Sequence, residues 1–189
     1  MSSGAGPVMA AAEFVDRTLQ NEGAWYRADD VEGRLGGRLS SYGSSVGAVR
    51  GTVRDVLRKY KDFDHDAVVQ LASALWGQPR PGAKPVFERR LAAIVLLQTR
   101  VQLLRHSDLT RIEGFLRSAG TRELTEPLLA DVVAPFLARL GGRDRQRADV
   151  VLARWRTDSD SQLRAAAAFI HQQAAPEAPP QGDTHERSL

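Results

Sequence analysis

The spacing of the apolar residues is the feature that most limits what this chain can fold into. Val49, Val53, Val56, Leu57 and Tyr60 fall at positions i, i+4, i+7, i+8 and i+11. This spacing places them on one stripe of a helix with about 3.6 residues per turn. The same period recurs along most of the sequence, and no segment makes a credible strand. The sequence therefore predicts an all-α fold.

The apolar stripes define a series of helices separated by short polar or Pro/Gly-rich connections. For one of them, Ser107 or Asp108 is the expected N-cap and Gly120 the expected end. Helices with such short connections favour antiparallel pairs, the repeating unit of an α-solenoid. The pairs share too little sequence to establish repeats, so a compact irregular bundle stays open. The expected helices cover residues 9–19, 28–39, 49–60, 68–75, 91–101, 109–116, 128–140, 150–155 and 159–172.

The composition of the two ends limits the folded part of the chain. A length of 189 residues, of which 42% are hydrophobic, suits one packed domain. The C-terminal residues include Pro176, Pro179 and Pro180 and almost no large apolar side chain, so they bury too little surface to offset the entropy lost on ordering. We expect a disordered N-terminus at 1–7, a helical domain at 8–173 and a disordered Pro-rich tail at 174–189.

Several classes of protein are excluded by what the sequence lacks. The longest apolar run, Leu91 to Gln98, is far short of the roughly 20 residues that cross a bilayer. The N-terminus also lacks the basic segment of a signal peptide, so we expect a cytoplasmic protein. Because the chain has no cysteine, it has no disulfide, thiolate zinc site or cysteine nucleophile. The four histidines have no metal-type spacing, and we expect no metal and no cofactor.

The charge of the chain permits nucleic-acid binding without requiring it. The net charge is +3 and the pI is about 9.7. Between Arg80 and Arg122, nine basic side chains occur with only three acidic ones. Only three of the 26 basic residues are lysine, and arginine favours phosphate through its planar fork of donors. A GC-rich genome would enrich arginine equally well, so both interpretations stay open.

Two kinds of side chain are candidates for function. Asp131 lies on the strongly apolar helix expected at 128–140, about one step off the edge of its apolar stripe. A carboxylate there either lines a groove or is simply solvated. Trp25, Trp76 and Trp155 could stack on bases, but Trp76 and Trp155 end apolar stripes, and we expect these two in the core.

Four segments, taken in order, carry a resemblance to a known family. They are Ser41-Tyr42-Gly43 with Val46 and Arg50, then Leu75-Trp76 with Phe87 to Ile94, then Ala130 to Leu137, and finally Trp155 with Asp160 and Leu163 to Ala166. Together they resemble the DNA alkylation repair family, HEAT-like DNA glycosylases that remove N3- and N7-alkylated purines. The resemblance implies a HEAT-like α-solenoid of antiparallel helix pairs.

The resemblance also implies a site and a partner. It places the catalytic carboxylate at Asp131, which would stabilise the positive charge that develops on the deoxyribose. The expected partner is double-stranded DNA with alkylated purines, bound by a nucleoid-associated monomer, with basic side chains on the phosphates. The expected DNA-binding residues are Arg50, Arg89, Arg90, Arg117, Arg122 and Arg164.

The chain departs from the family pattern at two aromatic positions. The family has a tryptophan four residues before the catalytic aspartate, where this chain has Pro127, and another just before Leu163, where it has Gln162. Aromatic faces beside a cationic lesion supply about 1–2 kcal/mol each. A non-catalytic relative that binds DNA or a protein through the same concave surface is therefore an alternative, as is a plain helical scaffold.

Overall fold

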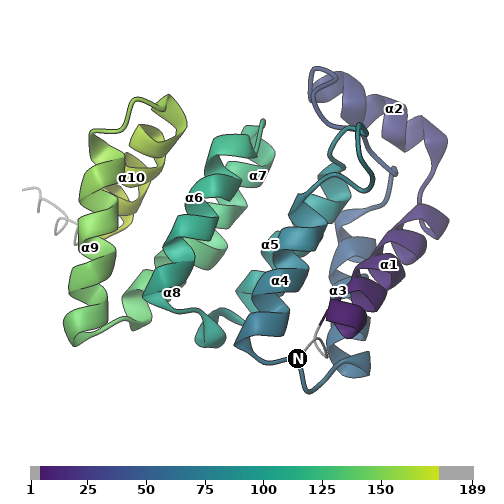
Figure 1. Cartoon of the computed structure of the whole chain (residues 1–189). Coiled ribbons are helices and arrows are strands. Elements are labelled where there is room, and N and C mark those ends of the chain that lie inside the picture. Colours follow the sequence, from purple (N-terminus) through teal and green to yellow (C-terminus); the bar gives the residue numbers. More distant parts are fainter. Residues whose placement is uncertain (1–4, 175–189) are drawn as a thin grey trace, which may run out of the picture.

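A computed structural model describes residues 5–174, and this part of the chain is built from helices (Figure 1). It contains no strand, only an isolated bridge between Ser40 and Val86, so the all-α prediction is confirmed. No described helix has the length and apolar character needed to span a membrane. The α-helices are α1 (Ala5–Asn21), α2 (Trp25–Arg34), α3 (Val46–Lys59), α4 (His65–Trp76), α5 (Phe87–Thr99), α6 (Leu109–Ser118), α7 (Arg122–Pro127), α8 (Ala134–Arg139), α9 (Gly142–Arg156) and α10 (Ser161–Ala174).

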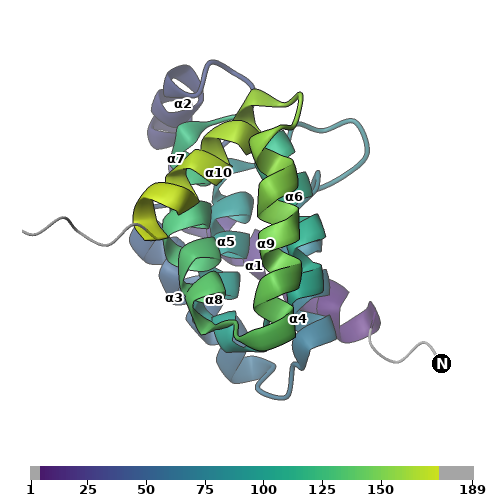
Figure 2. The ribbon, with the colours of Figure 1, turned by 90° about the vertical axis from the view of Figure 1, so that its left-hand side faces the viewer.

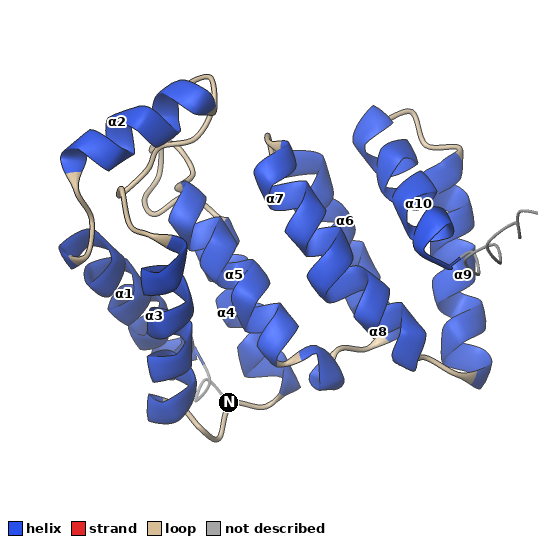
Figure 3. Cartoon of the chain, turned by 180° about the vertical axis from the view of Figure 1, so that it is seen from behind, coloured by secondary structure: helices blue, strands red, loops and turns tan. Residues whose placement is uncertain are grey.

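The helices stack as antiparallel pairs in two layers. Contacts join α1 with α3, α4 with α5, and α9 with α10, and Figures 1 and 3 show α6 beside α7–α8. Each of these four pairs packs against the next. Figures 1 and 3 show α1, α4, α6 and α9 in one layer and α3, α5, α7–α8 and α10 in the other, and Figure 2 shows the layers side by side. This is the expected α-solenoid. α2 lies across one end of the first pairs, outside both layers.

The core follows from the apolar stripes seen in the sequence. Valine, leucine and alanine side chains of every helix except α2 bury one face of each element. Trp76 stacks on Phe115 with ring centroids 4.4 Å apart, and Trp155 is fully buried, so the expected core positions of the two tryptophans are confirmed. Ser45 and Asp64 cap the starts of α3 and α4 by accepting backbone N–H groups.

Several boundaries differ from the expectation. α1 begins at Ala5, so residues 5–7 are helical rather than disordered, and Ala174 still belongs to α10. Residues 1–4 and 175–189, where we expected disorder, lie outside the described part of the chain. α2 ends at Arg34 instead of near Leu39, because Gly36 and Gly37 adopt positive φ angles of 64° and 69°. Asp108 occupies the N-cap position of α6, as one of the two expected residues, but its carboxylate accepts from the backbone N–H of Arg105 and not from the first turn of α6.

The helix that carries Asp131 is not a regular α-helix. Between α7 and α8, residues Leu128–Val133 form a π-helical turn, in which the N–H of Ala134 donates to the carbonyl of Leu129, five residues back. Pro135 has no N–H, so the carbonyl of Asp131 lacks the partner that it would have in an α-helix. The wider turn accommodates this loss, and π-turns of this kind are frequent at functional sites.

Candidate nucleic-acid interface

A groove lined by arginines lies between α3 and α5. Arg50, Arg54 and Arg58 are spaced four residues apart on α3, so they form one exposed stripe along the helix, called the arginine stripe below. Arg100 joins them from the end of α5, together with Gln98 and Thr99. The groove has a volume of about 470 Å³. Its lining combines four guanidinium groups with apolar side chains of Val53, Leu57 and Val95.

The guanidinium groups of this groove are largely free to bind an anion. Arg58 makes one long ion pair with Asp55, at 3.7 Å, and no ion pair joins Arg50, Arg54 or Arg100 to another of the described residues. The buried Nε atom of Arg100 has no hydrogen-bond partner within residues 5–174. A buried donor without a partner costs about 1–3 kcal/mol. The groove is therefore a positively charged surface whose donors fit phosphate oxygens.

Asp131 lies on the neighbouring helix but does not line this groove. Its π-helical turn packs against α5 and α10, and the side chain is half-buried. Leu129 lines a second groove, which faces α10, and Asp131 lies two residues further along, roughly half a turn around the helix from it. Within the described chain, no hydrogen bond or ion pair holds the Asp131 carboxylate.

Arg89 and Arg90 are buried, which corrects their expected role as DNA-binding residues. They are 4% and 5% exposed. Arg89 pairs with Asp16 and donates to the carbonyl of Ala74, at 2.6 Å. Arg90 donates to the carbonyl of Trp76 at 3.1 Å, and burial lowers its pKa to about 10. The two side chains satisfy carbonyls at the end of α4, which would otherwise lack donors, and neither can reach a phosphate.

Arg117 is also committed to a structural contact rather than to DNA. It binds Glu113 at 3.0 Å, Asp158 at 2.8 Å and Asp160 at 3.2 Å. Hydrogen bonds to Asp158 and Glu113 raise its pKa, and the three carboxylates more than cancel its charge. Because its donors are already used, the structure does not support the DNA contact that we expected for Arg117.

The remaining expected DNA-binding residues are exposed but do not gather in one place. Arg50 belongs to the arginine stripe. Arg122 pairs with Glu126 at 2.6 Å, and both line the second groove, between α7 and α10, together with Gln162. Arg164 donates to the backbone carbonyls that precede α10. Arg50 thus lies in the first helix pair. Asp131 and Arg122 lie in the third pair, on the continuous segment from α7 to α8, and Arg164 lies in the fourth.

Sequence reasoning did not identify Arg54, Arg58 and Arg100. The signal for the first two is present, because Arg50, Arg54 and Arg58 recur every four residues along the edge of the buried stripe of α3, next to Val53 and Leu57. Arg100 carries no such signal, since it joins the groove only through the packing of α5 against α3.

Comparison with known proteins identifies the family. A search of curated proteins finds no match to this chain. A family model described as DNA alkylation repair enzyme matches residues 15–186, which is most of the sequence. The match includes all four segments on which the resemblance rested. The chain therefore belongs to the DNA alkylation repair enzyme family.

Proposed function

We propose that this protein binds duplex DNA with alkylated purines and hydrolyses the N-glycosidic bond of an N3- or N7-alkylpurine. The observation that carries the proposal is the groove lined by Arg50, Arg54, Arg58 and Arg100, in which the only ion pair among the described residues is the long one between Arg58 and Asp55. A guanidinium group can donate two hydrogen bonds to one phosphate. Contacts between basic side chains and phosphates supply most of the sequence-independent affinity for DNA. Membership of a DNA repair family makes a DNA backbone the fitting partner.

Asp131 is the carboxylate that we propose for the chemical step. An N-alkylated purine is already cationic, so its bond to the sugar is weakened. As the carbon–nitrogen bond breaks, its electron pair neutralises the purine and positive charge develops on the deoxyribose. An anion nearby stabilises that charge, water then bonds to the sugar carbon, and its proton passes to the carboxylate or to solvent. Asp131 suits this role because no cation in the described chain neutralises it.

The catalytic proposal is tested by base release. DNA that contains N7-methylguanine or N3-methyladenine is incubated with the protein and with the Asp131→Asn variant, and the free base is quantified. Asparagine keeps the shape of the side chain and removes its charge. We expect release by the unaltered protein and its loss in the variant. Equal release by the two proteins would reject Asp131 as the catalytic group.

A second candidate function is DNA binding without catalysis. It is favoured by Pro127 and Gln162, which stand where the resembled family has tryptophans. Each missing aromatic wall removes about 1–2 kcal/mol of attraction to a cationic base, or about tenfold in rate. DNA binding that weakens with salt, without any base release, would support this function over the first.

A further inference from the structure

Two exposed aromatic side chains at the start of α2 have no role in the core. Trp25 is 78% exposed and Tyr26 is 58% exposed. α2 contributes no buried residue to the protein, whereas α3, α4 and α5 each bury several. Only Val31 of α2 packs against the core, and that side chain is only partly buried. A helix with so little core contact that presents two aromatic rings to solvent is typical of a binding surface. We call Trp25 and Tyr26 the aromatic patch.

The aromatic patch is held in position by Arg27. Its Nε donates to the carbonyl of Gly43 at 2.7 Å, and its Nη2 donates to the carbonyl of Glu22 at 3.1 Å. The guanidinium lies over the Tyr26 ring, 5.5 Å from its centroid. The Trp25 and Tyr26 rings meet edge to face, with centroids 6.0 Å apart and planes at 89°. Arg27 therefore supports the Tyr26 ring before any ligand binds, and Trp25 contacts that ring, which lowers the entropy cost of binding.

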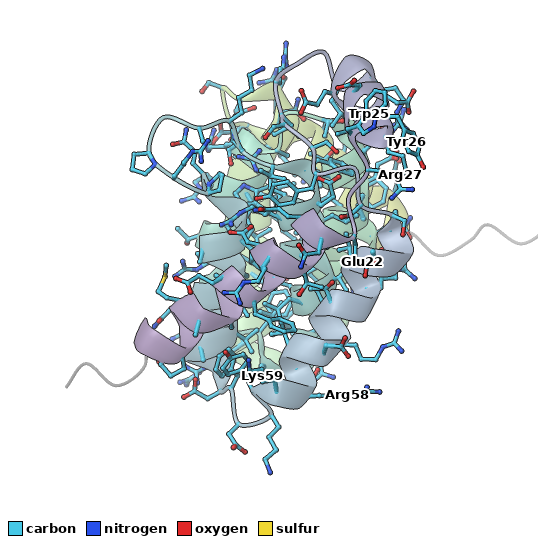
Figure 4. The ribbon with its side chains drawn as sticks, turned by 90° about the vertical axis from the view of Figure 1, so that its right-hand side faces the viewer. Glu22, Trp25, Tyr26, Arg27, Arg58 and Lys59 are labelled. Atoms are coloured by element: carbon cyan, nitrogen blue, oxygen red, sulfur yellow. The ribbon has the colours of Figure 1, made fainter. Side chains whose placement is uncertain are left out.

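The patch lies on the same side of the protein as the arginine stripe. Figure 4 shows Trp25, Tyr26 and Arg27 above Arg58, all at the edge of the molecule that α3 occupies. The patch and α3 are also linked through the chain. Gly43, whose carbonyl accepts from Arg27, lies three residues before Val46, the first residue of α3. A strand that follows the stripe along α3 toward its N-terminus would approach the patch.

The charges around the patch indicate which part of a nucleic acid it contacts. Glu22 and Asp29 are exposed within four residues of Trp25 and repel phosphate, and the one neighbouring cation, Arg27, already donates to two backbone carbonyls. The patch therefore favours contact with bases over contact with phosphates. Bases inside a duplex have both faces covered by their neighbours, whereas an unpaired base offers a face for stacking. We propose that the aromatic patch stacks on an unpaired base of DNA whose phosphates lie along the arginine stripe. This inference rests on the proposed DNA binding and not on catalysis.

The tryptophan fluorescence of the protein offers a direct test. Trp76 and Trp155 are buried, so Trp25 is the exposed one of the three tryptophans. A blunt duplex and the same duplex with a single-stranded extension are titrated into the protein at low salt. We expect the extension to raise the affinity at least about fivefold, and to quench Trp25, because stacking on one base is worth about 1–3 kcal/mol.

Three variants complete the test. Trp25→Ala should remove the gain from the extension and leave binding of the blunt duplex unchanged, whereas Trp25→Phe should keep most of the gain. Val150→Ala, a change at an apolar side chain 71% exposed on α9, serves as the control and should have no effect. A gain that survives Trp25→Ala would overturn the inference. So would Trp25 fluorescence that changes with protein concentration and not with DNA, since that indicates self-association.

The outcomes separate this inference from the proposed function. If the blunt duplex binds in a salt-dependent manner and the extension adds nothing, only the stacking inference fails. If neither DNA binds at low salt, the proposed function fails and the inference fails with it.

Discussion

The buried carboxylate of Glu88 accepts a hydrogen bond from the backbone N–H of Gly43 at 2.9 Å, which joins two segments 45 residues apart. The same carboxylate accepts from the Ser41 hydroxyl at 2.6 Å and from the N–H of Tyr42 at 3.0 Å. Two of the four segments that resemble the family, Ser41-Tyr42-Gly43 and the start of α5, therefore form one structural unit. Glu88 organises the loop that leads into α3 and so positions the arginine stripe.

Replacing Glu88 should destabilise the fold. Glu88→Ala leaves the Ser41 hydroxyl and the N–H groups of Tyr42 and Gly43 without their acceptor in the protein interior. We expect the free energy of unfolding to fall by about 3 kcal/mol. Glu88→Gln keeps the shape of the side chain but turns an amide N–H₂ toward one donor, so it should cost less. Urea denaturation measures both. Glu126→Ala is the control, because its exposed pair with Arg122 is worth at most about 1 kcal/mol. Equal losses for Glu88→Ala and Glu126→Ala would contradict this role.

Gly43 should tolerate no side chain. It has a φ angle of 73°, and a Cβ there would lie 2.1 Å from the carbonyl oxygen of Ala24. Gly36 has a similar φ angle of 64° but nothing within 4 Å of its Cβ position, which makes it a matched control. We expect Gly36→Ala to cost about 1–2 kcal/mol from backbone strain alone. Gly43→Ala should cost clearly more, in thermal or urea denaturation, and similar values would show that the close approach to Ala24 relaxes freely.

The arginine stripe should control the affinity for DNA and its dependence on salt. Arg54→Ala should weaken binding to any duplex sequence, and the slope of log affinity against log salt should fall by about 1 for each phosphate that the protein no longer binds. Arg17→Ala, at an exposed position of α1 in the other layer, should change neither quantity. Fluorescence anisotropy over a range of salt concentrations measures both. An unchanged slope in an Arg50, Arg54 double variant would exclude the groove as the DNA site.

The helices were predictable from the sequence because their cause is local. The period of the apolar residues sets the buried face of each helix, and residues such as Ser45 and Gly36 set the ends. The position of Asp131 was harder to predict. Pro135 has no N–H to donate to the Asp131 carbonyl, and residues Leu128–Val133 form a π-turn instead of an α-helix. A regular helical period does not describe that turn.

The roles of Arg89 and Arg90 were not predictable from their own segment. Two adjacent arginines at the start of a helix in a basic region indicate a surface that binds phosphate. Their real partners are carbonyls at the end of α4, which lie 14 and 15 residues away in the chain and come close only when α4 packs against α5. Burial of a charged group depends on such partners, and a single sequence does not show them.

His65 should make the stability depend on pH. Its Nε2 lies 2.9 Å from Asp108 and its Nδ1 lies 2.6 Å from Asp66. Burial opposes protonation, but the hydrogen bonds to the two carboxylates outweigh it and raise the pKa of His65. The folded state therefore binds the proton more tightly than the unfolded state does. The resulting stability is fully present below the unfolded pKa of about 6.5 and is lost as the pH rises through the folded pKa.

The urea midpoint of the unaltered protein should accordingly fall as the pH rises from about 6 to about 8. His65→Asn should remove this fall. His171→Gln, at an exposed position of α10, should retain it. A midpoint that rises over the same range would show that His65 is more basic in the unfolded chain.

Glu113 should stabilise the C-terminal helix pair. Its Oε2 accepts from the indole N–H of the fully buried Trp155 at 2.9 Å and also from Arg154, while its Oε1 accepts from Arg117 at 3.0 Å. Glu113→Ala leaves the buried indole N–H without an acceptor, and we expect a loss of about 2 kcal/mol in the free energy of unfolding. Glu113→Gln keeps an oxygen for Trp155 and should lose less.

The pH dependence separates the charge of Glu113 from its shape. Burial raises its pKa, but the hydrogen bonds from Trp155, Arg117 and Arg154 outweigh this effect and lower the pKa overall. The stability that its charge provides is thus present above the unfolded pKa of about 4.3 and is lost as the pH falls through the folded pKa. The difference between the unaltered protein and Glu113→Gln should be largest at neutral pH and shrink in acid. A difference that stays constant from pH 7 to pH 3 would mean that Glu113 acts through packing and not through its charge.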